Sequence, residues 1–293
     1  MRPDRVVIEL TNYCNLNCPY CLAGMQEDQQ SVAHSDLDRP FGKMDLSLAE
    51  KIITDANRFG IKEVMLTFQG EPLLHENFVD IIRFVKKTGM KAVVFTNGML
   101  LTPVLAKDII EAGLDSIRFS IDGASSQTYE SNRVGGDFPT VFNNLTQMAW
   151  IARELRSPID ITWQFIALKN NEHEISQARK IAKDIGVTFI VKTFAESVPE
   201  LTPRDPKYRR MLQKKPCIDI YRMICVYWNG DVVPCCYDMA GKEVMGNIRG
   251  QSFYDMWISP RYKDFRKRVH NAPRFPSDEP DLCKTCLKWA PVE

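Results

Sequence analysis

Short apolar runs rich in β-branched residues alternate along the chain with longer segments whose apolar positions recur at helical spacing. The runs predict buried strands at Val6–Leu10, Val64–Phe68, Ala92–Thr96, Ser116–Ile121, Ile159–Leu168 and Val187–Lys192. The segments between them predict helices at Ser47–Phe59, Asn77–Lys87, Pro103–Ala112, Val141–Leu155 and Glu172–Ile185, with Asp45, Asn77 and Asn171 as caps. Alternating strands and helices predict a parallel sheet, and chemistry in such sheets lies at the carboxyl ends of the strands.

Two polar stretches interrupt this alternation. Gln26–Lys43 is longer than a typical loop and is expected to be a lid or a flexible insert. Ser197–Pro216 contains four prolines among charged residues and predicts a linker. We therefore expect a core over residues 1–196, a linker over 197–216 and a smaller unit over 217–293. Periodicity alone leaves open whether the core is a closed barrel, an open doubly wound sheet or a partial barrel.

Composition narrows the classes of partner. The chain has 293 residues, with 38 basic and 37 acidic side chains, so its formal charge of +1 indicates neither a nucleic-acid partner nor a membrane surface. The basic run Arg261–Arg268 is either a local basic patch or, as is more common for such runs, a solvated helix face. No signal segment and no long uninterrupted apolar stretch is present, so we expect a cytoplasmic protein. Nine cysteines in such a chain indicate metal binding or reactivity more than disulfides.

Cys14, Cys18 and Cys21 follow the first predicted strand directly. Three thiolates can hold an iron–sulfur cube while leaving one iron without a protein ligand, whereas electron-carrying clusters and structural zinc sites are normally closed by four ligands. An open metal position indicates catalysis. The alternatives are a zinc knuckle completed by a distant histidine, or three buried thiols.

The stretch from Glu9 to Cys21 resembles the first strand and cluster loop of radical S-adenosylmethionine (radical SAM) enzymes. The resemblance implies a (β/α)6 partial TIM barrel and a [4Fe–4S] cluster whose open iron chelates the amine and carboxylate of SAM. It also implies one-electron cleavage of SAM to methionine and a 5′-deoxyadenosyl radical, which removes a hydrogen atom from substrate. The electron would come from a flavodoxin- or ferredoxin-type reductant.

Residues after the next strands are candidates for SAM contacts. Gln69-Gly70-Glu71-Pro72 resembles the family motif GGEP with glutamine in place of its first glycine. By this resemblance Glu71 accepts hydrogen bonds from the SAM ammonium, and Gly70 lets the backbone approach the ligand. A simple Gly-Pro turn is the alternative.

Later strand ends add further candidates for the same ligand. Asn97 follows the third strand, and by resemblance Ser120 and Arg133 bind the SAM carboxylate while Asp122 faces ribose or substrate. Leu168 closes a strand, Trp163–Leu168, that resembles the family segment packing on adenine, and Tyr20 is placed against the same ring. Turn formation, a surface position for Arg133 and core packing explain these residues equally well.

A second cysteine group lies near the C-terminus. Cys217, Gly230, Cys235 and the pair Cys283 and Cys286 resemble the shortened SPASM or twitch domain of radical SAM enzymes, a small α+β unit. This resemblance implies one auxiliary [4Fe–4S] cluster on Cys217, Cys235, Cys283 and Cys286. A four-cysteine zinc site fits the same spacing. Cys225–Val233 predicts a hairpin that turns at Asn229-Gly230.

Cys225 and Cys236 remain outside both ligand sets. Each is either a buried apolar thiol or a catalytic hydrogen-atom donor to a substrate radical, as in radical epimerases that resemble this architecture. Cys236 is also an alternative to Cys235 as a cluster ligand.

These observations predict a radical SAM oxidoreductase that dehydrogenates or epimerises a small molecule such as an aminocyclitol or sugar. A maturase of ribosomal peptides is the second reading, weakened because the barrel pattern begins by Val6 and Cys286 lies close to the end, leaving no room for a fused leader-recognition domain. A non-catalytic metal-binding or electron-transfer protein is the alternative of another class.

Overall fold

The computed structural model describes residues 2–21, 39–193, 199–209, 217–272, 277 and 279–284. Most of the predicted connection Gln26–Lys43 therefore lies outside the described residues, as do parts of the linker and Cys286.

Six parallel strands form the core, as the sequence predicts. They are β1 (Arg5–Ile8), β2 (Glu63–Leu66), β3 (Lys91–Thr96), β4 (Ser116–Ser120), β5 (Asp160–Ala167) and β6 (Thr188–Thr193). Neighbours in sequence are neighbours in the sheet from β1 to β6, which is the order of a barrel that does not close. The (β/α)6 partial barrel is confirmed.

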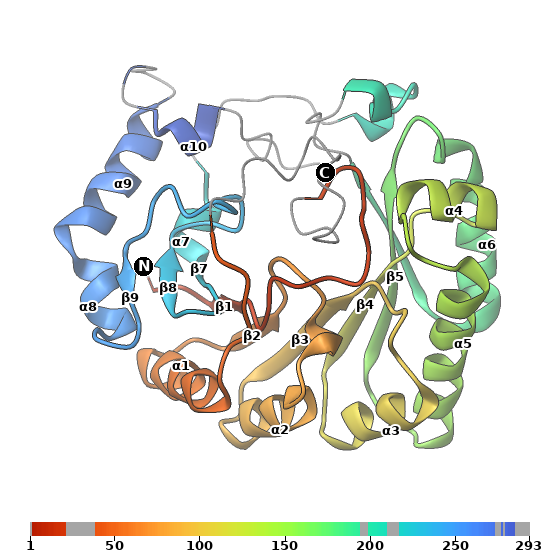
Figure 1. Cartoon of the computed structure of the whole chain (residues 1–293), viewed down its shortest axis with the longest axis horizontal. Helices are drawn as coiled ribbons and strands as arrows, with labels where there is room; N and C mark the ends of the chain where they lie inside the picture. The colour runs from red at the N-terminus through yellow and green to blue at the C-terminus, as the bar shows by residue number, and fades with distance from the viewer. Residues whose placement is uncertain are drawn as a thin grey trace.

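Helices cover the outer side of the curved sheet (Figure 1). They are α1 (Leu46–Phe59), α2 (Phe78–Lys87), α3 (Pro103–Glu111), α4 (Ser126–Asn132), α5 (Phe138–Glu154) and α6 (Ile175–Ile185), with short 3-10 helices η1 (Pro72–Leu74), η2 (Glu172–Glu174), η3 (Pro199–Leu201) and η4 (Pro206–Tyr208). Helix α4 was not expected, because its sequence is polar and too short to show a helical period. In the described part of the chain, no helix is long and apolar enough to cross a membrane.

The C-terminal segment extends the same sheet. Strands β7 (Met223–Val226), β8 (Asp231–Val233) and β9 (Gly246–Asn247) follow β1, so that β1 lies between β2 and β7. Strand β7 is parallel to β1, with Val7 opposite Cys225, and β8 returns antiparallel. The predicted hairpin is confirmed, and Gly230 at its turn has φ of 93°, which glycine adopts without strain. Helices α7 (Asp219–Arg222), α8 (Phe253–Ile258), α9 (Pro260–Asn271) and α10 (Asp281–Lys284) complete this part.

The predicted caps differ in how they act. Asp45 accepts a hydrogen bond from Leu48 N at 2.7 Å and caps α1 as expected. Asn77 and Asn171 occupy cap positions but make no capping hydrogen bond with their side chains. Asn171 instead accepts from Leu168 N at 2.7 Å and donates to Asp122 O at 3.1 Å, so it braces two loops at the strand ends.

We expect Asp45→Ala to lower the free energy of unfolding by about 1 kcal/mol through loss of the cap. Hydrogen bonds from Ser47 and Arg249 lower the pKa of Asp45 from 3.8 to about 2. A carboxyl with a lowered folded-state pKa stabilises above its unfolded pKa, and this stabilisation fades as pH falls from about 4 towards 2. Denaturant unfolding at pH 7 and pH 3 measures both effects. Asp45→Asn keeps the capping acceptor, so it should lose only the part of the stability that depends on pH. If Asp45→Ala were as stable as the parent, Asp45 would not be the cap of α1.

Candidate functional site

The loop that carries Cys14, Cys18 and Cys21 packs against the turn after β2. Glu71 N donates to Tyr13 O at 2.8 Å, and Gly70 has φ of 71°. A Cβ atom at Gly70 would collide with Thr11 O. The glycine is therefore needed because the cysteine loop itself approaches this closely, and its approach to the ligand stays a prediction.

Glu71 joins the ends of β2 and β3. Its side chain is 1% exposed and accepts hydrogen bonds from Thr96 Oγ1 at 2.7 Å, Asn97 N at 2.8 Å and Leu73 N at 3.1 Å. Burial raises the pKa of Glu71 to about 6 despite these donors. Oε1 receives two of the three bonds and Oε2 only one, so Oε2 retains room for a further donor.

Asn97 links this turn to the cysteine loop. Its Nδ2 donates to Asn15 Oδ1 at 2.8 Å and lies 3.9 Å from Cys14 Sγ. The first predicted cysteine ligand is thus held against the end of β3, where the sequence placed Asn97.

Asp122, after β4, is the centre of a buried charged cluster. Tyr20 Oη donates to its Oδ2 at 2.6 Å, Ile166 N donates to its Oδ1 at 2.6 Å, and Arg133 Nη2 lies 2.6 Å from Oδ2. Asp122 has no exposed surface. Burial alone would lower the pKa of Arg133, but Asp122 together with Tyr20, Cys18 and Tyr129 outweighs it, so the pKa is raised and the guanidinium stays charged.

Arg133 also reaches the second cysteine, because its Nη1 lies 3.7 Å from Cys18 Sγ. Asp122 and Arg133 thus bind each other and adjoin the cysteine loop. Their roles towards ribose or substrate and towards the SAM carboxylate stay predictions. Ser120 lies half-buried at the end of β4, and Leu168 is buried just past β5. The structure brings Tyr20, Asp122 and Arg133 together, on strand ends that also carry Ser120 and Leu168.

The three thiols suit a multi-iron cluster. Burial and the nearby Glu71 raise the pKa of Cys14 to about 12, and burial raises that of Cys18 to about 11. Such thiols become thiolates when a metal supplies compensating positive charge. Three thiolates can bind three irons of a cube and leave the fourth open, so this donor set fits a [4Fe–4S] cluster.

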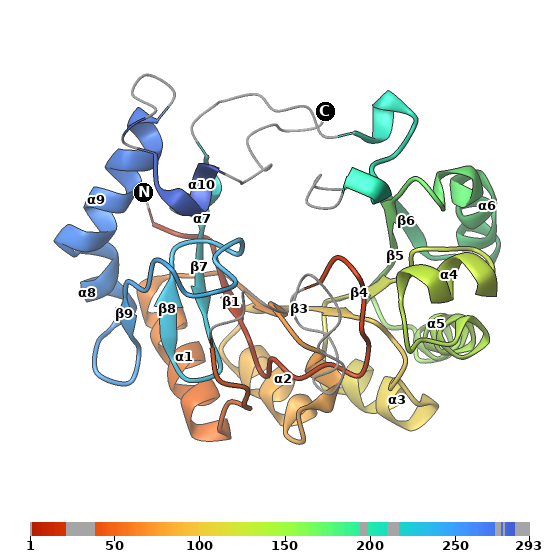
Figure 2. The ribbon, with the colours of Figure 1, turned by 45° about the horizontal axis from the view of Figure 1, so that its top comes forward.

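The C-terminal cysteines gather around β7. Cys225 is 0% exposed within the sheet, opposite Val7 and Val233. Cys236 is half-buried and packs on the same apolar cluster, and a hydrogen bond with Cys236 is the main cause that raises the pKa of buried Cys235. Cys217 precedes α7 and Cys283 lies in α10, and both helices lie on the same flank of the molecule in Figures 1 and 2. Cys286 lies outside the described residues.

Comparison with known proteins gives these two cysteine groups a family context. The family model of the Radical SAM superfamily matches residues 8–149, and that of the SPASM iron–sulfur cluster-binding domain matches residues 217–287. A GTP 3′,8-cyclase of Limosilactobacillus fermentum is 31% identical over 98% of this chain and 80% of that protein. The chain belongs to the radical SAM superfamily.

Other relatives of this radical SAM protein carry different names. The tungsten-containing aldehyde ferredoxin oxidoreductase cofactor-modifying protein of Pyrococcus furiosus is 25% identical over 88% of this chain and 82% of its own length. SuiB of Streptococcus suis superposes with a TM-score of 0.73 at 14% identity, covering 91% of this chain and 68% of SuiB. BtrN in complex with AdoMet and 2-DOIA gives 0.61 at 20% identity, covering 98% and 93%. These two structures share the fold.

Membership in the family implies the cofactors. A SAM-binding [4Fe–4S] cluster belongs to the radical SAM core and an auxiliary iron–sulfur cluster to the SPASM domain.

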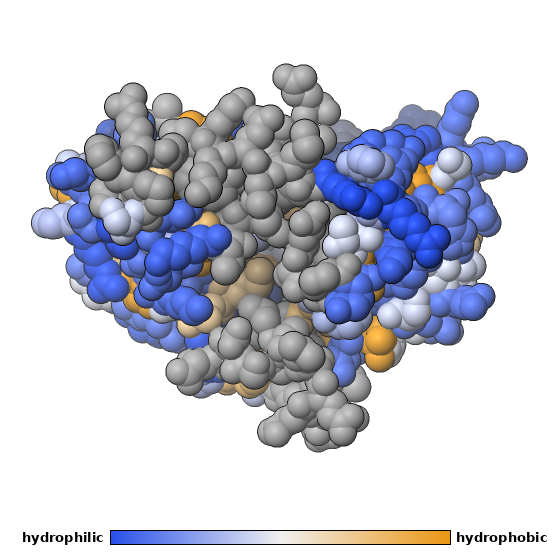
Figure 3. Space-filling model, turned by 90° about the horizontal axis from the view of Figure 1, so that it is seen from above, coloured by the Kyte–Doolittle hydropathy of each residue, from blue (hydrophilic) through white to orange (hydrophobic). Residues whose placement is uncertain are grey.

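Seen from above in Figure 3, hydrophilic side chains gather over both flanks of the molecule, and hydrophobic ones show near the middle of this face.

Two links between the radical SAM core and the SPASM part were missed from the sequence. Arg39 forms two hydrogen bonds with buried Glu9, at 2.9 and 3.1 Å, and stacks 3.5 Å above the Tyr227 ring. Both Arg39 Nε and Gln69 Nε2 donate to Met239 O, at 3.0 and 3.3 Å. The sequence did carry one indication of these links. Gln69 replaces the first glycine of the motif, and a long amide side chain at that position needs a hydrogen-bond partner.

We expect Gln69→Gly, which restores the family motif, to lower the free energy of unfolding by about 1–2 kcal/mol. It removes the hydrogen bond to Met239 O and empties buried volume next to it. The Gln69 Oε1 atom is buried without a partner, so Gln69→Met, which removes this acceptor too and keeps the length, should cost less. Urea unfolding of both variants measures the difference, and a Gln69→Gly variant as stable as the parent would refute the link.

Proposed function

We propose that this protein is a radical SAM oxidoreductase that removes a hydrogen atom from a carbinol carbon of a small polar molecule such as an aminocyclitol or sugar. The outcome would be dehydrogenation or epimerisation. The observation that carries the proposal is the parallel pairing of β7 with β1, which places the C-terminal segment with its cysteines beside the strand that leads into Cys14, Cys18 and Cys21. An enzyme that only starts a radical needs the first group alone.

When bound, SAM and its [4Fe–4S] cluster supply the 5′-deoxyadenosyl radical. Cys14, Cys18 and Cys21 would hold that cluster. The free acceptor site on Glu71 Oε2 supports a role in binding the SAM ammonium, because Glu71 already adjoins the cysteine loop. Ser120 and Arg133 are the candidates for the SAM carboxylate.

Cys217, Cys235, Cys283 and Cys286 would hold the auxiliary cluster, which supplies a one-electron acceptor. Dehydrogenation needs such an acceptor, because a substrate radical must lose one proton and one electron to become a carbonyl. Epimerisation needs a thiol that returns a hydrogen atom. Complete burial of Cys225 inside the sheet favours Cys236 as that donor, since Cys236 is half-buried. We further propose a cytoplasmic location and a flavodoxin- or ferredoxin-type reductant.

The test is hydrogen transfer from labelled substrates. Anaerobically reconstituted protein, SAM and dithionite would be incubated with aminocyclitols and sugars that carry deuterium at each carbinol carbon in turn. We expect deuterium in 5′-deoxyadenosine from one position, with a ketone as the dehydrogenation product or an inverted alcohol as the epimerisation product. Formation of 5′-deoxyadenosine that never acquires deuterium from this class would refute the proposal.

Peptide maturation is the second candidate. It is favoured by the fold shared with SuiB, one structure of which is bound to precursor peptide SuiA and superposes with a TM-score of 0.71. Transfer of deuterium from a labelled precursor peptide, and from no aminocyclitol or sugar, would select this function instead.

A further inference from the structure

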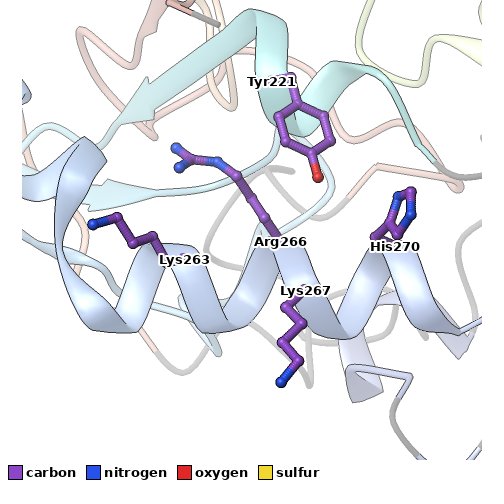
Figure 4. Close-up of a pocket in the computed structure, with 5 residues that line it drawn as sticks. All are labelled: Tyr221, Lys263, Arg266, Lys267 and His270. Atoms are coloured by element: carbon purple, nitrogen blue, oxygen red, sulfur yellow. The ribbon is translucent and has the colours of Figure 1, made fainter.

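Helix α9 presents a basic pocket of about 400 Å³, lined by Lys263, Arg266, Lys267 and His270 together with Tyr221 of α7. These positions recur at helical spacing, so they share one side of the helix. Figure 4 shows the four basic side chains leaving α9 in different directions and Tyr221 reaching from α7 towards the helix. Lys263, Lys267 and His270 are exposed, so the two lysine ammonium groups meet solvent directly.

The positive charge of this pocket is not neutralised by the part of the chain that the structure describes. No acidic side chain lines it, and neither Lys263 nor Lys267 forms an ion pair there. Arg268 on the same helix differs, because it pairs with Glu243 at 3.2 Å and with Asp264 at 3.0 Å. Acidic residues are thus available nearby, but they compensate the neighbouring arginine.

Arg266 adds a cation beneath this surface. Its Nη1 donates to Trp257 O at 2.9 Å, and the Tyr262 hydroxyl is a second polar neighbour. The guanidinium lies 3.6 Å above the Trp257 ring and 4.1 Å from the centre of the Tyr262 ring. These neighbours stabilise the cation without supplying negative charge, so Arg266 adds to the positive potential of the pocket.

The pocket lies close to part of the C-terminal cysteine group. Tyr221 lines it from α7, and Cys217 lies two residues before that helix begins. Helix α10, which carries Cys283, lies beside α9 in Figures 1 and 2. The basic surface therefore adjoins two of the four cysteines that would hold the auxiliary cluster.

We propose that this basic pocket on α9 is the docking site of an acidic one-electron carrier protein of the ferredoxin class. The proposal rests on the proposed dehydrogenation, in which a hydrogen atom passes to the 5′-deoxyadenosyl radical, a proton passes to solvent and one electron remains. One oxidised carrier would take up that electron and become reduced. Charge complementarity selects an acidic partner, and closeness to Cys217 and Cys283 selects an electron carrier over other acidic proteins.

The test measures binding without turnover. An acidic [4Fe–4S] ferredoxin would be titrated into the reconstituted holoprotein at low and high salt, using the parent chain and the charge-reversed double variant Lys263→Glu/Lys267→Glu. The matched control is Lys180→Glu/Lys183→Glu, since both lysines are exposed on α6, across the molecule from α9 (Figure 1). Iron content and thermal unfolding confirm that each variant is folded and loaded.

We expect charge reversal on α9 to weaken ferredoxin binding by about tenfold or more at low salt and to reduce its salt dependence, with the α6 variant unchanged. Equal effects of the two variants, or no binding by the parent chain, would overturn the proposal. Binding of a 20-nucleotide RNA in place of ferredoxin, lost in the α9 variant, would overturn it in favour of nucleic acid. Because the experiment measures ferredoxin binding and no substrate turnover, its result can be interpreted even if the proposed dehydrogenation is wrong.

Discussion

Replacement of Cys18 by alanine is expected to abolish the formation of 5′-deoxyadenosine from SAM. Cys18 is one of only three thiols in the N-terminal group, and a cluster that already has an open iron does not tolerate loss of a further ligand. Two [4Fe–4S] clusters give about eight iron atoms per chain, and this variant should retain about four. Iron and sulfide analysis after anaerobic reconstitution, with chromatographic detection of 5′-deoxyadenosine, measures both changes.

Cys283→Ala is the complementary variant. Cys283 lies in α10 and belongs to the C-terminal group, so its loss should remove the other half of the iron and leave SAM cleavage by dithionite intact. If Cys18→Ala kept its full iron content and still cleaved SAM, the assignment of the two cysteine groups would be wrong.

Asp122→Ala is expected to lower the free energy of unfolding by about 3–5 kcal/mol, because it leaves the Arg133 cation largely buried and without its carboxylate. Tyr20 Oη and Ile166 N lose their acceptor at the same time. Tyr20 and Arg133 both adjoin Cys18, so iron content should fall together with stability. Urea unfolding and iron analysis of the reconstituted protein measure the two effects.

The control is a double-mutant cycle with Arg133→Met. Asp122→Asn with Arg133→Met removes both charges and keeps an acceptor for Ile166 N, so the pair should cost less than Asp122→Ala alone. If the losses in free energy of unfolding from the two single substitutions add up to the loss in the double variant, the two side chains are not coupled.

The strands of the core were predictable because each is a short apolar run with β-branched residues, and buried parallel strands need no more than that. Val64 and Leu66, for example, face the helices from β2, inside the predicted run. The sequence also showed which strand ends carry polar groups. Glu71 and Asn97 meet there, as expected for the ends of neighbouring parallel strands.

Which side chains and strands these polar groups contact could not be predicted from the sequence. That Arg133 binds Asp122 depends on α4, a helix without a readable period, which ends directly before Arg133. That β7 joins β1 is a pairing between distant parts of the chain, and local patterns carry no information about such contacts. The bond between Gln69 and Met239 has the same origin, since it exists only because the C-terminal segment returns to the core.

The position of β1 has a consequence for how the chain folds during synthesis. Strand β1 leaves the ribosome first, yet its partner β7 is made only after the whole core has been translated. Until then the backbone groups of Arg5–Ile8 form an open edge, of the kind that pairs readily with another chain. A nascent or truncated core should therefore be prone to self-association. Pairing of β7 with β1 would cover the open edge and prevent this association.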